Sequence, residues 1–409
     1  MTNPTIEPPS VRPRTARELG IMQGFPPPPE KRPTLADWDL APMNRWAFQH
    51  VRGLIPTVEV PAAAAPWELP AAHQDLSAIR FRDDQGRERT IGRWLADSYT
   101  DGFLAWHRGR VVAELYLNDM TPATLHLAQS VSKSVVGTTA GILVGQGLLD
   151  PDAPFVDYVP EMAASGYGDA RLTHAFDMTS GVRFTEDYNA PDSDMTRIDV
   201  ASGWRPAPDG APRPTIRDVL LGLPKQREHG LVFDYRSIET DALAWAMERA
   251  TGKPLAALVS ELLWQPMGAE REACFTVDGA GTALADGGFN AGLRDFARLG
   301  RLLLEGGRRD GRQLVPADWI GQIRRGGDPA KFGAPYTEVC PRGAYSRQWW
   351  TNDRSRGDVM ARGVFGQLIY VDPEGDFLAV KLSSWPDYLI PAFSRDSLAA
   401  LAAIRQALG

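Results

Sequence analysis

The chain has 409 residues, of which 43% are hydrophobic and 23% are charged, and its formal net charge is −7. This composition is typical of a globular protein with one large domain or two lobes, and the negative charge gives no electrostatic footprint for nucleic acid or an anionic membrane. Cys274 and Cys340 are the only cysteines, too few for a disulfide framework or a zinc cluster. We therefore expect two reduced structural thiols, and neither nucleic acid nor a membrane as a partner.

The N-terminal segment, residues 1–33, holds nine prolines, four of them consecutive at Pro26–Pro29. Proline lacks the N–H group that helices and sheets require, so we expect an extended arm that wraps the body or stays mobile. The start of the chain lacks the pattern of a secretory signal. The longest apolar run, residues 135–149, is about five residues short of a membrane span. These features favour a cytoplasmic protein.

Strand and helix patterns then alternate along the chain. GFLAWH and VVAELYL predict a hairpin turned at Arg108-Gly109-Arg110, and a buried helix follows SVSK. TDALAWAMERATGKPLAALVSELLW predicts two amphipathic helices broken at residues 252–254, and LRDFARLGRLLLEGG predicts another that ends at its glycines. Strand patterns return in SRQWWT, VFGQLIYV and FLAVKLSSW, before a closing helix SLAALAAIRQAL.

This order of elements predicts an α/β fold, in which a mixed sheet built from both chain ends is flanked by helices. We expect residues 34–149 and 291–409 to form this α/β lobe, and residues 150–290 to form an inserted, mainly helical lobe. The predicted cleft lies where the two lobes meet.

Ser130 and Lys133 stand three residues apart where the buried helix begins, which places them on one helix face. A serine hydroxyl becomes a strong nucleophile only when a base takes its proton. A lysine amine serves once desolvation lowers its pKa, and the apolar run behind Lys133 is expected to supply that desolvation. The helix N-terminus adds free N–H groups where an oxyanion forms. The structural alternative is that Ser130 is an N-cap and Lys133 reaches to solvent.

Other nucleophile and cofactor patterns are missing from the sequence. There is no G-x-S-x-G elbow, no metal-ligand spacing among the six histidines and no phosphate-binding glycine loop. The sequence therefore implies no metal and no cofactor. His126 is a rival base, which we interpret as structural. Tyr235, in FDYRS ahead of a helix, is a candidate proton relay if a cation holds its phenol near ionisation.

The motifs SVSK, HAFDMTSGV and FDYRS together resemble the serine β-lactamase and penicillin-recognising superfamily. Within it the chain is similar to the 6-aminohexanoate-dimer hydrolases, with matching stretches from about residue 33 to residue 387, among them PTLADWDLAPMNRWAF, EDYNAPDS, LADGG and VKLSSWPD. The resemblance implies that Ser130 is an acylated nucleophile with Lys133 and Tyr235 as its proton-handling partners. It further implies that the Val364 N–H joins the Ser130 N–H in an oxyanion hole.

The sequence also departs from relatives that attack β-lactams. Those relatives generally carry Tyr-x-Asn and Lys-Thr-Gly, where this chain has Tyr235-Arg236-Ser237 and Ala361-Arg362-Gly363. A β-lactam carboxylate would lose its usual cation, unless Arg362 points inward and replaces it. Antibiotic hydrolysis is therefore disfavoured.

An acidic stretch, residues 185–200, carries five carboxylates and one arginine. Most such stretches are solvated loops, but at the edge of a cleft this one would attract a cationic substrate end. The resemblance implies that Tyr188 closes over the substrate and hydrogen-bonds the scissile amide nitrogen, and that Asp199 pairs with a substrate amine. Asp286 is the third implied binding residue, at a position where the nylon-oligomer enzyme has asparagine or histidine.

The sequence therefore predicts a serine hydrolase that cleaves small linear amides of the 6-aminohexanoate-dimer type, and short-chain esters, through an acyl-enzyme. Three alternatives stay open: a carboxylesterase without an amidase role, a β-lactamase or D-alanyl carboxypeptidase, and a ligand-binding relative without catalysis. The sequence does not distinguish a monomer from a homodimer. It also leaves open whether Lys133 or Tyr235 is the general base, because the pair would titrate as a coupled unit.

Overall fold

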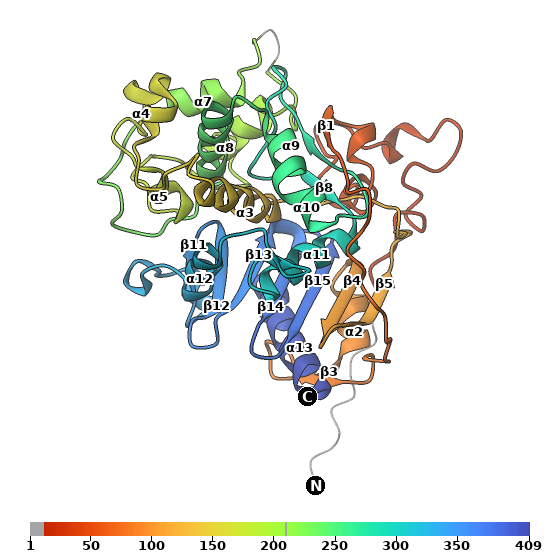
Figure 1. Cartoon of the computed structure of the whole chain (residues 1–409). Coiled ribbons are helices and arrows are strands. Elements are labelled where there is room, and N and C mark those ends of the chain that lie inside the picture. The colour runs from red at the N-terminus through yellow and green to blue at the C-terminus, as the bar shows by residue number, and fades with distance from the viewer. Residues whose placement is uncertain (1–11, 209–210) are drawn as a thin grey trace.

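The structure is a computed structural model that describes residues 12–208 and 211–409. Its centre is a seven-stranded antiparallel sheet to which both chain ends contribute, which confirms the predicted α/β architecture (Figure 1). In sheet order the strands are β11 (Ala344–Ser346), β12 (Trp349–Asp353), β13 (Asp358–Gly363), β14 (Gln367–Asp372), β15 (Phe377–Ser383), β4 (Thr100–His107) and β5 (Arg110–Tyr116).

Alternate residues of the central strands face opposite layers, as expected for the two-residue period of a buried strand. On β4, Leu104 and Trp106 belong to the larger apolar cluster, which α11 joins from one face. Phe103 and Ala105 belong to a second cluster on the other face, with α2 and α13. The flanking helices are α2 (Ile91–Asp97), α11 (Leu293–Leu304) and α13 (Pro391–Leu408).

The structure also contains a second, four-stranded antiparallel sheet. Its strands, in order, are β1 (Thr57–Val60), β7 (Ala273–Thr276), β8 (Phe289–Ala291) and β6 (His126–Leu127). The stretch that the sequence predicted as mainly helical therefore also supplies two short strands, β7 and β8. Two small hairpins complete the strands, β2 (Arg80–Arg82) with β3 (Glu88–Thr90) and β9 (Arg308–Arg309) with β10 (Arg312–Gln313).

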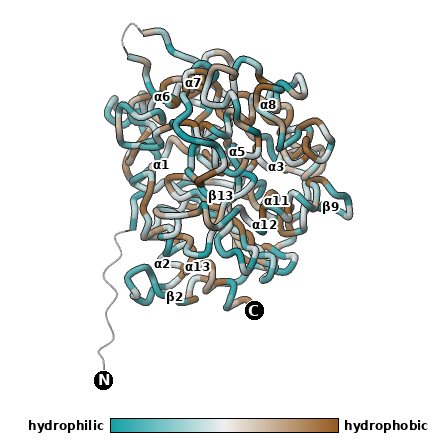
Figure 2. Tube along the Cα trace, turned by 90° about the vertical axis from the view of Figure 1, so that its left-hand side faces the viewer, coloured by the Kyte–Doolittle hydropathy of each residue, from teal (hydrophilic) through white to brown (hydrophobic). Residues whose placement is uncertain are grey.

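Helices form a lobe at one end of the large sheet, with α6, α7 and α8 far from α2 and α13 and with α3 and β13 between them (Figure 2). These helices are α3 (Val131–Gly145), α4 (Phe155–Tyr158), α5 (Leu172–Phe176), α6 (Asp194–Ala201), α7 (Ile216–Gly222), α8 (Ile238–Thr251), α9 (Leu255–Leu258) and α10 (Gln265–Met267). Two further helices, α1 (Asn44–Ala47) and α12 (Ala317–Arg325), pack elsewhere on the core.

The predicted helix breaks are confirmed by the backbone. The helix α8 ends where Gly252 takes a left-handed conformation, with φ of 69°, and Pro254 precedes α9. The predicted third helix is α11, and it ends just before Gly306 and Gly307. Glycine and proline therefore mark these boundaries because the local backbone requires them.

The described part of the N-terminal arm lies against the body. Ala16 and Ile21 are buried, and the Ala16 N–H donates a hydrogen bond of 2.8 Å to Asn118 Oδ1. The first eleven residues of the predicted arm lie outside the described residues. No helix in the described part of the chain is long and apolar enough to span a bilayer.

Candidate active site

The N-terminus of α3 places Ser130 beside Lys133. Ser130 is the N-cap residue of the helix, and Gln129 before it has a left-handed φ of 50°. Lys133 Nζ donates a hydrogen bond of 2.9 Å to Ser130 Oγ and another of 2.7 Å to the carbonyl oxygen of Asp286. Lys133 is only 1% exposed, so its amine does not reach bulk solvent. The structure thus brings together the two residues that the S-x-x-K spacing singled out.

Tyr235 approaches the same pair from the loop ahead of α8. Lys133 Nζ lies 5.2 Å from the centroid of the Tyr235 ring. That ring stacks on Trp350 of β12 with a centroid distance of 5.3 Å, and the Tyr235 N–H donates a hydrogen bond of 2.9 Å to the Tyr336 hydroxyl. Aromatic packing on one side and a backbone hydrogen bond on the other therefore fix the phenol over the lysine.

The charge state of Lys133 differs from the one that the sequence suggested. Burial acts to lower the pKa of Lys133, but interactions with the acidic groups Tyr235, Asp286, Glu186 and Asp241 outweigh burial and raise that pKa above its ordinary value. The expectation that desolvation makes Lys133 a neutral base at rest is therefore wrong. The sequence displays the apolar helix behind the lysine, whereas the fold supplies the carboxylates.

The phenol of Tyr235 is also held in its protonated form. Burial raises the pKa of Tyr235, and the positive charge of Lys133 opposes this effect without overcoming it. At rest the pair therefore carries both protons. A site of this kind takes the serine proton only after the pair has released one.

The end of β13 lies directly against the residues that precede the serine. A side-chain carbon built on Gly363 would lie 2.7 Å from the Ala128 carbonyl oxygen and 3.0 Å from Gln129 Cβ, so only glycine fits there. The next residue, Val364, begins the turn Val364–Gly366. Within the described residues, the N–H groups of Ser130 and Val364 have no hydrogen-bond partner. Both N–H groups are therefore free to bind an oxyanion.

Tyr188 is held by a carboxylate that sequence analysis did not single out. The Tyr188 hydroxyl donates a hydrogen bond of 2.6 Å to Glu186, and its ring stacks on Tyr388 with a centroid distance of 5.1 Å. Glu186 also accepts hydrogen bonds from the N–H (2.8 Å) and the hydroxyl (2.5 Å) of Ser237, at the start of α8. The only signal for Glu186 in the sequence is its place in the acidic stretch, which does not distinguish it from its exposed neighbour Asp187.

Asp199 lies half-buried near other acidic groups. Its pKa is raised well above the ordinary value by burial and by the charge of Asp39, against the opposing charge of Arg205. Arg205 is already paired with Asp39 at 2.6 Å. Within residues 12–208 and 211–409 the Asp199 carboxyl group has no hydrogen-bond or ion-pair partner. The carboxyl group is therefore available to a cationic ligand.

Asp286 contributes to the site mainly through its backbone, because its carbonyl group accepts the Lys133 hydrogen bond. Its side chain is 2% exposed, and burial raises the pKa of Asp286 to about 6. Among the described residues, Oδ2 of this carboxyl group has no hydrogen-bond partner. The side chain therefore adds negative charge beside the lysine.

Comparisons with known proteins agree with this geometry. Residues 97–404 match the Beta-lactamase family. The chain belongs to this family. It is a serine hydrolase fold in which the Ser130–Lys133 pair lies at the start of a buried helix.

Relatives of the chain within the Beta-lactamase family are named as hydrolases and esterases. The chain is 39% identical to a 6-aminohexanoate-dimer hydrolase of Paenarthrobacter ureafaciens over 358 residues, which are 87% of this chain and 89% of that protein. It is 29% identical to Esterase EstB of Burkholderia gladioli over 199 residues, 46% of this chain and 48% of that protein. The family and the names of these relatives together support that the chain is an enzyme, a serine hydrolase.

A solved structure shows the same fold at high similarity. A Bacillus anthracis protein, provisionally named a 6-aminohexanoate-dimer hydrolase, superposes with a TM-score of 0.85 at 26% identity. The match covers 93% of this chain and 98% of that one. The whole described body, including the helical lobe, therefore follows the architecture of this group.

Two arginines mark where the chain departs from β-lactam-hydrolysing relatives. Arg236 is 1% exposed and donates hydrogen bonds to Ser180 and Asp234, so it faces the protein and serves structure. The Arg362 guanidinium lies 5.3 Å from the centroid of the Trp350 ring and donates a weak hydrogen bond to Cys340. Arg362 and Tyr235 thus contact the same Trp350 ring.

Proposed function

We propose that this serine hydrolase cleaves small linear amides of the 6-aminohexanoate-dimer type, and short-chain carboxylic esters, through an acyl-enzyme on Ser130. The convergence of Ser130, Lys133 and Tyr235 carries this proposal, because the lysine donates a hydrogen bond to the serine and lies against the tyrosine ring. A serine without such partners is a poor nucleophile, and a buried lysine without a function is costly. The name of the Paenarthrobacter relative supports the substrate class.

The reaction begins when Ser130 Oγ attacks the carbonyl carbon of the substrate. The hydroxyl proton passes to the Lys133–Tyr235 pair once that pair has released a proton, and the N–H groups of Ser130 and Val364 bind the oxyanion. The pair then protonates the leaving amine or alcohol, which departs and leaves an ester on Ser130. Water, activated by the same pair, hydrolyses this ester and restores the serine.

Asp199 supports the choice of an amine-bearing substrate. An aminohexanoate dimer ends in an ammonium group, and the carboxyl of Asp199 has no partner within the described residues. Because the pKa of Asp199 is raised, the group is protonated over more of the pH range than an exposed aspartate. Binding an ammonium favours its ionised form, so affinity for this substrate should rise as the pH rises through that raised pKa.

Tyr188 supports amide cleavage by its position. Its hydroxyl donates to Glu186, which also accepts a hydrogen bond from Ser237, two residues after Tyr235, and we infer that this hydroxyl turns to the scissile amide nitrogen when substrate is bound. An ester has no such nitrogen to bind. Tyr188 is therefore proposed to matter for amides and not for esters.

The test compares three substrates on matched variants: the aminohexanoate dimer, the same dimer acetylated on its amine, and a short nitrophenyl ester. Ser130→Ala should abolish turnover of all three, and activity near wild type would contradict the acyl-enzyme. Asp199→Asn should lower kcat/KM for the free dimer by about tenfold or more, as expected for loss of a buried charge pair, and leave the ester unchanged. Equal losses on the free and acetylated dimers would show that no ammonium binds Asp199.

A further inference from the structure

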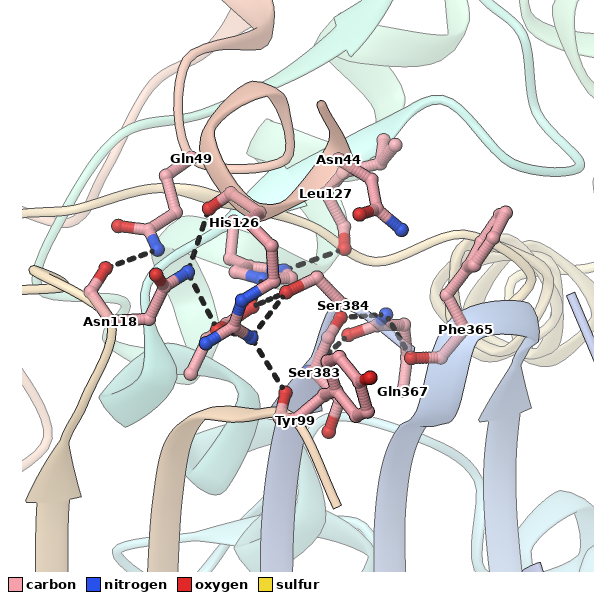
Figure 3. A network of polar contacts seen from close by, with 12 residues as sticks. Asn44, Gln49, Tyr99, Asn118, His126, Leu127, Phe365, Gln367, Ser383 and Ser384 are labelled. Carbon is pink, nitrogen blue, oxygen red and sulfur yellow. Dashed lines mark hydrogen bonds and ion pairs between the residues drawn. The ribbon is translucent and has the colours of Figure 1, made fainter. Parts of the chain in front are cut away.

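A network of polar contacts joins His126, Asn118, Ser384, Ser383 and Gln367 (Figure 3), and a buried carboxylate in it accepts hydrogen bonds from four side chains. Asp101 on β4 is fully buried and accepts hydrogen bonds from Arg45 (2.7 Å), Asn118 (2.9 Å), Ser384 (2.6 Å) and His126 (3.1 Å). A buried carboxylate is stable only when its oxygens are satisfied in this way. Burial acts to raise the pKa of Asp101, but the charges of Arg45 and His126 outweigh burial and lower it. The group is therefore a fixed anion.

One branch of this network leads from Asp101 to the nucleophile. His126 Nε2 faces Asp101, and His126 Nδ1 lies 2.9 Å from the carbonyl oxygen of Leu127. Both ring nitrogens are therefore engaged by oxygen atoms other than Ser130 Oγ. His126 therefore connects Asp101 to the Leu127 backbone and does not act as the base for Ser130. Leu127 lies three residues before Ser130, whose N–H is the first oxyanion donor.

The other branch leads from Asp101 to the second donor. Ser384 donates a hydrogen bond to Asp101. The neighbouring residue, Ser383, binds both ends of the Gln367 amide through its backbone. Gln367 Nε2 donates to the Ser383 carbonyl at 2.6 Å, and Gln367 Oε1 accepts from the Ser383 N–H at 3.1 Å. The same Nε2 lies 3.4 Å from the carbonyl oxygen of Val364. Gln367 is 2% exposed, so water does not compete for these contacts.

The turn after Val364 needs this support because its backbone is unusual. Phe365 has a left-handed φ of 60°, a conformation that is rare for a bulky residue. Its N–H donates to the Tyr388 carbonyl at 2.9 Å, and its carbonyl oxygen lies 3.3 Å from Gln367 Nε2. Val364 is the residue directly before Phe365 and begins this turn. The orientation of the Val364 N–H therefore depends on the conformation of the turn.

An aromatic ring joins the two branches. Phe48, just after α1, meets His126 edge to face at 5.9 Å and Phe365 edge to face at 5.2 Å. Its carbonyl oxygen also accepts the Leu127 N–H at 2.8 Å. Segments about 240 residues apart in the chain, one before Ser130 and one after Val364, therefore rest on a common support.

We propose that Gln367, held through Ser383 and Ser384 on the Asp101 anion, is a positioning residue that keeps the Val364 N–H in register with the Ser130 N–H. This inference rests on the proposed function, because it assumes that the two N–H groups bind an oxyanion. Such donors accelerate a reaction only when they are oriented before the charge develops. Loss of the Gln367 amide therefore affects the transition state more than the bound substrate.

The test replaces Gln367 by Met, which keeps the length of the side chain and removes its polar atoms. Turnover of a short nitrophenyl ester is measured per active site, with sites counted by labelling with a fluorophosphonate. We expect kcat per labelled site to fall by about tenfold or more, since loss of a whole donor costs about 100- to 1,000-fold, and KM to change less than threefold. Affinity for an aliphatic trifluoromethyl ketone, whose carbonyl carbon bonds to Ser130 Oγ and leaves an oxyanion, should fall in proportion to kcat.

Two further variants separate positioning from stability. Tyr370 lies on the same strand as Gln367, β14, but away from the turn, and Tyr370→Phe removes its buried hydrogen bond of 2.7 Å to Asp358 of β13 and should leave kcat per site unchanged. Ser384→Ala weakens the support without touching Gln367, should fold, and should lower kcat per site by about threefold or more.

The outcomes are distinguishable. If Gln367→Met and Ser384→Ala both keep kcat per site within twofold of wild type, or if Tyr370→Phe loses as much as they do, the positioning role is overturned. The proposed function is tested separately, because it fails only if Ser130→Ala retains turnover. The inference is supported if kcat per site and ketone affinity fall in proportion in Gln367→Met and Ser384→Ala, and not in Tyr370→Phe.

Discussion

Glu186 shows how one side chain couples the geometry and the charge of the site. It binds the Tyr188 hydroxyl and the N-cap residue of α8, Ser237, so it connects the acidic loop to the helical lobe. Its negative charge also raises the pKa values of Lys133 and Tyr235. In the proposed mechanism the pair releases one proton before it accepts the proton of Ser130, so we expect this charge to set the pH range of the reaction.

Replacing this carboxylate by Gln should shift the pH profile to lower pH. With the charge of Glu186 removed, the pKa values of Lys133 and Tyr235 fall, so the pair loses its proton at a lower pH. For wild type we expect kcat/KM on a neutral nitrophenyl ester to rise with pH above neutrality. In Glu186→Gln this rise should move by roughly one pH unit towards acid. The measurement is the pH dependence of ester turnover, corrected for spontaneous hydrolysis.

Asp187→Asn provides the matched control. Asp187 is exposed and accepts backbone hydrogen bonds from Asn189 and Ala190 through one oxygen, which asparagine retains. Its pH profile should coincide with that of wild type. An unshifted profile in Glu186→Gln would contradict the role of this charge.

At the scale of an element, α3 is defined by glycines as much as by its catalytic residues. Gly137, Gly141 and Gly145 recur every fourth residue and so lie on one face. A side-chain carbon on Gly141 would lie 2.4 Å from the Trp319 ring, whose Nε1 donates a hydrogen bond of 3.1 Å to the Gly137 carbonyl. The glycines leave this face of α3 without side chains, so α12 packs directly against the backbone of the helix that begins after Ser130.

Gly141→Ala should therefore destabilise the protein even though alanine favours helices. Alanine gains about 1 kcal/mol of helix propensity, but overpacking against the buried Trp319 costs about 1–3 kcal/mol. We expect a net loss of up to about 2 kcal/mol in the free energy of unfolding, measured by denaturant titration.

The same substitution at Gly321, within α12, is the control. There the new carbon would meet only the end of the flexible Arg325 side chain, at 3.0 Å. Gly321→Ala should be neutral or slightly stabilising. If Gly141→Ala proves as stable as Gly321→Ala, close packing of α3 on α12 does not limit stability.

Local spacing explains which parts of the site could be predicted. Ser130 and Lys133 share one helix turn, so their contact follows from the sequence alone. The acidic surroundings of Lys133 could not be predicted, because Glu186, Asp241 and Asp286 reach it from three distant segments. The sequence therefore identified the pair and misjudged the charge on its lysine.

At the scale of the whole molecule, the fold was predictable in outline. The hairpin β4–β5 and the strands β14 and β15 have alternating or apolar patterns, and the pairing of β4 with β15 closes the sheet between the two chain ends. The small sheet was not predicted, because β6 and β8 have two and three residues and pair across 160 positions. Such short strands carry no period, so only tertiary contacts define them.

The same closure of the sheet buries a lysine that has no catalytic assignment. Lys381 on β15 is 1% exposed, lies between the Trp94 and Trp385 rings at 5.7 and 5.8 Å, and donates hydrogen bonds to Ser98 and Ser383. Burial lowers the pKa of Lys381 to about 7, with the charge of Asp101 opposing and that of Arg45 assisting. In the unfolded chain the ordinary pKa of a lysine is about 10.4.

This difference predicts a stability that increases with pH. Between about pH 7 and pH 10 the unfolded chain binds a proton at Lys381 that the folded protein does not, so the free energy of unfolding rises with pH by up to about 1.4 kcal/mol per unit from this group. Below pH 7 both states are protonated, and the folded state bears the full cost of a buried ammonium. Lys381→Met removes this contribution, so its stability relative to wild type should be greatest near pH 6 and should decline steadily towards pH 10. Denaturant unfolding of both proteins at pH 6, 8 and 10 measures the difference, and a difference independent of pH would show that Lys381 keeps its proton in the folded protein throughout.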